Sequence, residues 1–165
     1  MVSIVKATPK TDFTAVSRVY YDTWQSAYRH LIPAGFLKQL TPTSWHPEKR
    51  WQNTFLAIAG SEEIVGVCSF GRARTADYAG WGELYSLYVL PQFQRQHVGS
   101  QLMDQALKRL SQTYENNYVR VLNNNLAAQK FYLKFGFMKT NTVLEDVTRF
   151  GTIRELVMIR EEQNH

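Results

Sequence analysis

The sequence predicts a single α/β (α+β) domain in which helices cover the faces of a mixed sheet. Segments with helical and strand-like spacing alternate along the chain in the order β-α-α-β-β-β-α-β-α-β-β. The 165 residues, 44% of them hydrophobic, are enough to bury one sizeable core. No internal repeat, low-complexity tract or linker divides the chain. We therefore expect residues 1–165 to fold as one unit.

The first part of the chain predicts a short strand and two helices. Ile4 to Ala7 is strand-like, and Asp12 can cap the helix that follows. One face of that long helix is predicted by apolar residues spaced three or four apart, namely Phe13, Val16, Tyr20, Trp24, Ala27 and Leu31. Pro33 ends this region, and a second short helix is indicated by Phe36, Leu37 and Leu40.

The middle of the chain predicts a hairpin, a long strand and a helix. The apolar runs Phe55–Ala59 and Ile64–Phe70 are separated by a turn-forming segment at 60–63. A strand is predicted at Glu83–Leu90. After Gly99, a helical stripe is formed by Leu102, Met103, Ala106, Leu107 and Leu110.

The last part predicts a strand, a helix and two more strands. Tyr118–Leu122 is strand-like, and Asn123–Phe135 is a helix that Gly136 can terminate. One side of this helix carries Ala128, Phe131, Tyr132 and Phe135. Two strands follow, at about Phe137–Leu144 and Thr152–Arg160, with a turn between them at 145–151.

Composition excludes several classes of protein. No apolar run approaches the roughly 20 residues that cross a bilayer, and Met1–Lys6 lacks the apolar core of a signal peptide. We therefore expect a cytoplasmic protein that does not enter a membrane. The net charge of +5 suits an acidic partner such as a nucleotide-like cofactor. Because the basic residues are scattered and no nucleic-acid-binding motif is present, we expect no nucleic-acid partner.

No metal site is expected. A single cysteine excludes an internal disulfide and a multi-cysteine metal site. Cys68 lies in an apolar run and is interpreted as a buried small hydrophobic residue, not a nucleophile. The remaining candidate ligands, His30, His46 and His165, show no ligand spacing with carboxylates or with the cysteine.

The segment Leu84–Ser100 is the strongest local signal. An aromatic-rich strand breaks at Pro91, and Gly99 starts an amphipathic helix. The first N–H groups of a helix lack internal partners and carry the positive end of its dipole, so this arrangement predicts a phosphate-binding turn. Taken alone, the loop is equally consistent with an ordinary β-α turn. A dinucleotide-binding loop is disfavoured because the Gly-x-Gly-x-x-Gly spacing is absent.

Two segments resemble the GNAT superfamily of N-acetyltransferases. The family's acetyl-CoA loop, Gln/Arg-x-x-Gly-x-Gly/Ala, aligns with Gln94–Gly99. A second family segment, Asn-x-x-Ala-x-x-Phe-Tyr-x-x-x-Gly-Phe, is similar to Asn125–Phe137. The resemblance implies a mixed, mostly antiparallel central sheet flanked by helices, with acetyl-CoA as cosubstrate. His97 stands where the loop has its first glycine, which would reach a positive φ more easily.

The resemblance also implies which residues bind acetyl-CoA. Leu87 and Val89 would pair with the pantetheine arm through backbone groups, and a backbone N–H near Val89 would polarise the thioester carbonyl. Asn125 would lie near the same arm, or serve simply as a helix N-cap. The complete implied set is Leu87, Tyr88, Val89, Gln94, Arg95, Gln96, His97, Val98, Gly99, Ser100, Asn125, Ala128, Phe131 and Tyr132.

Two residues are candidates for the proton transfers that acetylation of an amine requires. By resemblance, Glu83 is a candidate general base, with a solvated carboxylate at the strand end as the alternative. Tyr132 is a candidate general acid toward the coenzyme sulfur. It is protonated at neutral pH because the ordinary tyrosine pKa is about 10. Its alternative role is a core tyrosine beside Phe131.

The acceptor is predicted only as a class, the primary amine of a small molecule or a peptide, attacking directly in a ternary complex. Trp24 and Tyr28 are the candidate acceptor-binding residues, with core packing as the alternative for Trp24. Tyr20, Tyr21 and Phe36 lie on the same segments, and the late turn offers negative charge at Glu145 and Asp146. The alternative function is a non-catalytic acyl-CoA-binding or sensing module. A homodimer is possible, with the strand Ile153–Ile159 as a pairing edge.

Overall fold

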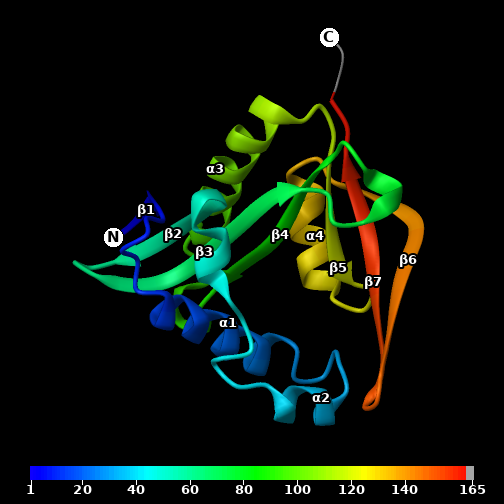
Figure 1. Cartoon of the computed structure of the whole chain (residues 1–165), viewed down its shortest axis with the longest axis horizontal. Coiled ribbons are helices and arrows are strands. Elements are labelled where there is room, and N and C mark those ends of the chain that lie inside the picture. The colour runs from blue at the N-terminus through cyan, green and yellow to red at the C-terminus, as the bar shows by residue number, and fades with distance from the viewer. Residues whose placement is uncertain (163–165) are drawn as a thin grey trace.

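A seven-stranded sheet in the order β1-β2-β3-β4-β5-β7-β6 forms the centre of the molecule (Figure 1). The computed structural model describes residues 1–162. The strands are β1 Val2–Lys6, β2 Thr54–Ala59, β3 Glu63–Arg72, β4 Gly82–Val89, β5 Asn117–Leu122, β6 Met138–Thr148 and β7 Gly151–Arg160. The α-helices are α1 Phe13–Ala27, α2 Ala34–Gln39, α3 Val98–Thr113 and α4 Leu126–Lys134. Short 3₁₀ helices are η1 Pro47–Asn53, η2 Ala76–Tyr78 and η3 Pro91–Phe93.

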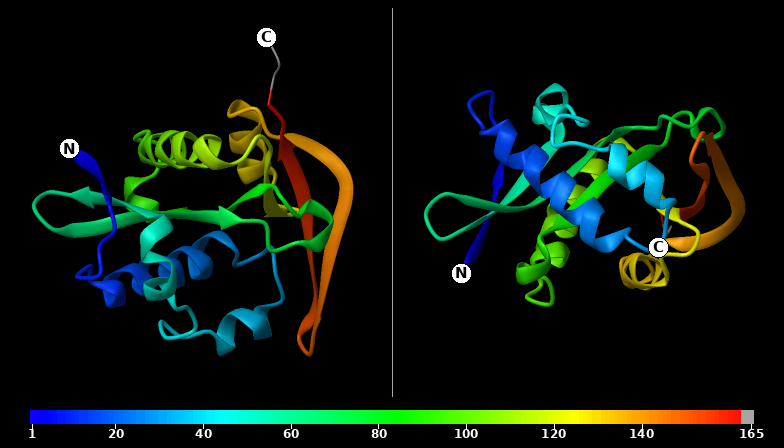
Figure 2. Two further views of the ribbon diagram at one scale, coloured as in Figure 1. Left: turned by 45° about the horizontal axis from the view of Figure 1, so that its top comes forward. Right: turned by 90° about the horizontal axis from the view of Figure 1, so that it is seen from below.

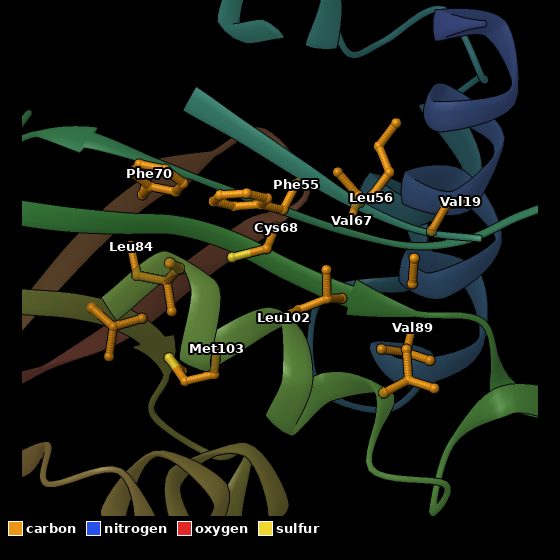
Figure 3. Packing of buried hydrophobic residues seen from close by; sticks show 14 of the residues in the cluster. Val19, Phe55, Leu56, Val67, Cys68, Phe70, Leu84, Val89, Leu102 and Met103 are labelled. Atoms are coloured by element: carbon orange, nitrogen blue, oxygen red, sulfur yellow. The ribbon is translucent and has the colours of Figure 1, made fainter. Parts of the chain in front are cut away.

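The helices form two layers, with α3 and α4 on one face of the sheet and α1 and α2 on the other (Figure 2). The apolar stripe of α3 is buried against β2, β3 and β4, where Leu102 and Met103 meet Cys68 and Leu84 (Figure 3). The predicted domain of helices around a mixed, mostly antiparallel sheet is confirmed.

The strands β4 and β5 diverge along their length. They form the sheet's parallel pair, but they pair only where Gly82, Glu83 and Leu84 face Asn117, Tyr118 and Val119. A bulge in β4 shifts its register against β3 between Ser69 and Phe70. Bulges bend a strand and re-aim its side chains. The second half of β4 therefore leaves an opening in the sheet beside β5.

Several boundaries differ from the predictions, and four of the differences have a clear structural reason or extent. The first helix ends at Ala27 instead of near Leu31, because the N–H groups of Leu31 and Ile32 both bond to the Tyr28 carbonyl in a turn. The helix predicted at Asn123–Phe135 begins at Leu126 instead. Asn125 precedes it as the N-cap, and its side chain accepts a hydrogen bond from the Ala128 N–H. The opening strand begins at Val2. β6 continues to Thr148, because its pairing with β7 extends to the hairpin tip.

The C-terminal strand does not form a sheet edge. β7 pairs with β5 on one side and with β6 on the other. Its backbone groups are therefore engaged on both sides, and the prediction that Ile153–Ile159 pairs across a dimer interface is wrong. The edge on this side of the sheet is β6.

The tip of the β6–β7 hairpin packs against the start of α2. A Cβ on Gly35 would lie 2.6 Å from the Phe150 ring, so this contact requires glycine. Phe36 and Phe150 also meet edge to face, with ring centroids 6.4 Å apart. A small second core of Ile32, Leu37 and Leu122 lies behind them. These contacts close one end of the α1–α2 face.

Candidate functional site

The opening between β4 and β5 forms a cavity of about 580 Å³ on the side of α3 and α4, here called the cofactor cleft. Predicted cofactor residues from β4, the loop before α3, and α4 come together here: Leu87, Tyr88, Val89, Gln94, Arg95, His97, Val98, Gly99, Ser100, Asn125, Ala128, Phe131 and Tyr132. Gln96 is not among the lining residues, and its side chain donates to the Gln92 carbonyl instead.

The edge of β4 that faces the opening offers free backbone donors. The N–H of Leu90 bonds to the Val65 carbonyl of β3 at 2.9 Å. Because N–H groups along a strand alternate between its two edges, those of Leu87 and Val89 point toward the opening. The Val89 carbonyl accepts a bond from Gln94 Nε2 at 3.0 Å, which ties the loop to the strand.

The loop before α3 has a backbone shape that usually requires glycine. His97 has a φ of 62° and Arg95 a φ of 63°. Histidine is one of the more tolerant non-glycine residues in this left-handed region. His97 therefore takes the conformation expected of the glycine it replaces, and it occupies the N-cap position of α3 without a capping hydrogen bond from its side chain. The unpaired N–H groups of the first helical turn point out of this end.

Basic side chains surround that helix N-terminus. Arg95 and His97 line the cofactor cleft and are exposed. Lys134, at the end of α4, lines the same cleft and was missed because it stands at a variable position within the segment Asn125–Phe137. Together with the positive end of the α3 dipole, these groups make a site for an anion.

Tyr132 lies in the wall of the cofactor cleft with only 8% of its surface exposed. Its ring packs against Phe131 and Phe137, with centroid distances of 5.5 and 5.9 Å. Burial, with a smaller effect of Tyr88 and Cys68, raises the pKa of the Tyr132 hydroxyl. This hydroxyl consequently stays protonated well above neutral pH and can donate a proton.

A second cavity of about 550 Å³ lies on the α1–α2 face, here called the acceptor cavity. It shares five lining residues with the cofactor cleft, namely Tyr28, Tyr85, Ser86, Tyr88 and Arg120. All five come from the end of α1 or from the diverging strands β4 and β5. The two cavities therefore meet through the opening in the sheet.

Aromatic rings form one wall of the acceptor cavity. Trp24 and Tyr28 meet edge to face at 4.7 Å, and Tyr20 stacks with Trp45 at 5.9 Å. Both predicted acceptor residues, Trp24 and Tyr28, line this cavity, as do Tyr20 and Phe36, whereas Tyr21 is not among its lining residues. Trp45 was missed because it lies in an irregular segment without periodicity. The floor is held by hydrogen bonds that join Tyr20 to Ser86 and Ser86 to Ser69.

Glu83 is held inside the sheet and lines neither cavity. Its side chain is 0% exposed. The carboxylate accepts hydrogen bonds from the Arg74 N–H (2.8 Å), Nε (3.1 Å) and Nη2 (2.6 Å), and from the Tyr118 hydroxyl. Burial alone would lower the pKa of Arg74, but the bonds and charge of Glu83 raise it. Arg74 itself lines the acceptor cavity.

Further carboxylates reach the acceptor cavity from the β6–β7 side. Glu155 on β7 pairs with Arg120 on β5 at 2.6 Å, and both line the cavity. Asp146 on β6 also lines it, whereas Glu145 pairs with Arg154 and does not. Of the predicted negative charges, the structure therefore places Asp146 at the cavity.

Within residues 1–162, no group of three or more His, Cys, Asp or Glu side chains is arranged to hold a metal ion. His165, considered above as a ligand, lies outside the described residues. Across the same range, none of the helices is long and apolar enough to cross a bilayer. Cys68 is buried, and burial raises the pKa of its thiol.

Comparison with known proteins agrees with this arrangement. Residues 17–137 match the model of the acetyltransferase (GNAT) family. The uncharacterized N-acetyltransferase YuaI of Bacillus subtilis is 28% identical over 120 residues, which cover 69% of this chain and 68% of that protein. The PaiA N-acetyltransferase of Thermoplasma acidophilum, solved in complex with coenzyme A, superposes with a TM-score of 0.77 at 16% identity, covering 98% of this chain and 99% of that one. YncA of Salmonella typhimurium, solved with its cofactor acetyl-CoA, gives 0.73 at 15%, covering 100% and 96%.

Proposed function

This chain belongs to the GNAT family of acetyltransferases, and we propose that it acetylates the primary amine of a small molecule or a peptide in a ternary complex. As a member of the family it is an acyltransferase with acetyl-CoA as cosubstrate. The observation that carries the proposal is the meeting of two cavities at the opening between β4 and β5. An amine on one face can reach a thioester bound on the other.

The cofactor cleft fits acetyl-CoA in shape and in charge. The free N–H groups of Leu87 and Val89 suit the amide-containing pantetheine arm, which would lie beside β4 like an added strand. The N-terminus of α3, with Arg95, His97 and Lys134 nearby, suits the negatively charged pyrophosphate. Acetyl-CoA supplies the acetyl group as a thioester, so that one C–N bond forms, one C–S bond breaks, the amine loses a proton and the thiolate gains one.

Tyr132 is proposed as the group that returns a proton to the leaving sulfur. Its hydroxyl lies in the cleft wall, and its raised pKa keeps the proton available at the pH where amines react. Within residues 1–162, no hydrogen bond contributes to the raised pKa of this hydroxyl. The Val89 N–H is proposed to polarise the carbonyl, since it faces the opening and is a fixed donor.

The removal of the amine's proton has more than one candidate. Glu83 is proposed as one candidate general base. Because its carboxylate is buried, the proton of the amine would have to reach it through the Tyr118 hydroxyl or an inserted water. Glu155 and Asp146 are the carboxylates that line the acceptor cavity directly. Substitution of Glu83, described below, separates these routes.

The experiment that tests the function is an acetylation assay over a panel of amines, with acetyl-CoA as donor and free CoA thiol as the readout. Because Cys68 is buried, the protein adds little thiol background. At least one primary amine should release CoA well above the hydrolysis rate measured without acceptor. Acetyl-CoA should also raise the melting temperature at concentrations above its dissociation constant, by an amount that grows with the logarithm of its concentration. Failure of every amine together with no thermal shift would contradict the proposal.

A further inference from the structure

We propose that the acceptor carries an anionic group, such as a carboxylate, in addition to the amine that is acetylated. The inference rests on the proposed function and extends it from amines in general to amines of one charge pattern. It is carried by basic side chains at one side of the acceptor cavity and by carboxylates at the other.

Two guanidinium groups flank a single aromatic ring in the acceptor cavity. The guanidinium carbons of Arg50 and Arg74 lie 4.4 and 4.3 Å from the centroid of the Tyr85 ring, and all three residues line the cavity. Lys49 lines it as well. In the described range 1–162, neither Lys49 nor Arg50 forms an ion pair. Lys49 and Arg50 consequently hold positive charge that no ion pair with a described carboxylate neutralises, whereas Arg74 is paired with Glu83.

Glu83 fixes one of these guanidinium groups in place. Its Oε2 accepts bonds from Nε and Nη2 of Arg74, and its Oε1 accepts one from the Arg74 backbone N–H. Nη1 of Arg74 is left without a hydrogen bond to any residue in the described chain. A guanidinium held on one side by a buried carboxylate is a preorganised donor for an anion on its other side.

The position of Tyr85 places this cluster beside the reaction centre. Tyr85 lies at the bulge of β4 and lines both cavities. The ring lies over β3 because Gly71 has no side chain there: a Cβ on Gly71 would lie 2.6 Å from the Tyr85 hydroxyl oxygen. An anionic group held by Arg50 or Arg74 at this wall of the cavity would therefore sit close to the opening through which the acetyl group passes.

The opposite side of the acceptor cavity suits the ammonium form of the amine. Asp146 and Glu155 come from β6 and β7, whereas Tyr85 lies on β4 and Arg74 in the loop after β3, and β5 lies between the two sides. The remaining charged lining residues are Arg120, paired with Glu155, and His46, beside Glu48. A molecule with an amine and an anion matches both sides, whereas a diamine would place a cation against Arg50 and Arg74.

The test compares matched acceptors. The acceptors are a series of ω-amino acids of increasing chain length and one aromatic amino acid. Each is assayed beside its uncharged primary amide. The amino acids should show kcat/KM at least about tenfold above their amides, the effect of one hydrogen bond to a charged group. Arg50→Gln should remove most of this preference by raising KM for the acids only. Arg50→Glu should reverse it in favour of diamines.

Two controls keep the outcome interpretable. Arg72→Gln removes a nearby exposed arginine that does not line the acceptor cavity, and its preference should equal that of the wild type. The second control measures binding without turnover. It records the rise in melting temperature caused by CoA, and the further rise when the preferred amino acid is added to the CoA complex. Equal kcat/KM for acids and amides, or a preference unaffected by Arg50→Gln and Arg50→Glu, would overturn the inference while amine acetylation itself stands. No acetylation and no shift with acetyl-CoA would instead remove the proposed function.

Discussion

The two cavities that meet at the β4–β5 opening differ in the groups that they offer to a ligand. The cofactor cleft is built around backbone groups: the edge of β4 at Leu87 and Val89, and the first turn of α3. The acceptor cavity is built from side chains that α1, η1, β4, β5 and the β6–β7 hairpin bring together. A backbone site tolerates exchange of side chains provided that φ and ψ are kept. A side-chain site changes its ligand with single substitutions.

Because of this difference, we expect side-chain substitutions to alter binding of the amine acceptor more readily than binding of acetyl-CoA. His97 replaces a glycine in the cofactor loop, yet its φ of 62° preserves the shape of that loop. On the acceptor side, the pair formed by Arg74 and Glu83 joins the loop after β3 to β4 and fixes one charge in the cavity wall. Substitutions on the two sides should therefore affect different kinetic constants.

The largest effect is expected for Tyr132→Phe. Tyr132 lies in the cofactor cleft, but unlike the backbone groups there it is proposed to act through its side chain. Turnover should fall about 100-fold or more, a typical contribution of a general acid, with KM for acetyl-CoA little changed. Since burial raises the Tyr132 pKa above its ordinary value, the loss should be constant from pH 7 to about 10. Steady-state kinetics over that range provide the measurement.

Tyr114→Phe is the matched control, because it removes a tyrosine hydroxyl outside both cavities. Turnover of Tyr132→Phe equal to that of this control would remove Tyr132 as the acid.

Glu83→Gln tests a residue that supports the acceptor side from within the sheet. Loss of its charge weakens the bonds from Arg74 and Tyr118, so the free energy of unfolding should fall by about 1–3 kcal/mol. Urea denaturation measures this, with the exposed Glu63→Gln on β3 as control. KM for anionic acceptors should rise, because Arg74 loses its anchor, while KM for acetyl-CoA should not.

The pH profile of Glu83→Gln decides whether Glu83 is also the general base. If Glu83 is the general base, the loss of turnover in Glu83→Gln should shrink as pH rises, because the amine then loses its proton without a base. A loss equal at all pH values would restrict Glu83 to positioning Arg74.

Gly71→Ala probes the acceptor side without changing any charge. The new Cβ would lie 2.6 Å from the Tyr85 hydroxyl oxygen, so the ring must shift away from its place between Arg50 and Arg74. KM for the preferred acceptor should rise several-fold, and the dissociation constant of CoA, measured calorimetrically, should stay within about twofold. An equal effect on both ligands would break the separation of the two sides.

The smallest effect is expected for His97→Gly on the cofactor side. Glycine removes the strain of a left-handed residue, about 1 kcal/mol, but costs a similar amount of chain entropy. The dissociation constant of CoA should change by less than about threefold. His97→Val, a β-branched residue poorly suited to positive φ, should weaken binding more. If both variants bound equally, the backbone conformation of the loop would not control affinity.

That most of the proposed cofactor residues line one cavity could be predicted, because these residues are contiguous within two segments of the chain. Strand, proline, loop and helix N-terminus follow one another in Leu84–Ser100, and Asn125–Phe137 adds the opposite wall. Residue periodicity also located α3 and the β2–β3 hairpin. The 3₁₀ helix η1 was missed, since its few residues show no periodicity, and with it Lys49 and Arg50. The pairing of Glu83 with Arg74 depends on strand register and on a loop conformation that no local pattern encodes.

Hydrogen–deuterium exchange with and without acetyl-CoA tests most directly whether the two faces have separate ligands that meet at the opening. Acetyl-CoA should slow exchange at Leu87–Val89 and in the first turn of α3, Val98–Gln101, and should leave η1 at Pro47–Asn53 unchanged. Unchanged exchange along β4 and at the start of α3, or protection centred on η1, would contradict this assignment of the cofactor cleft.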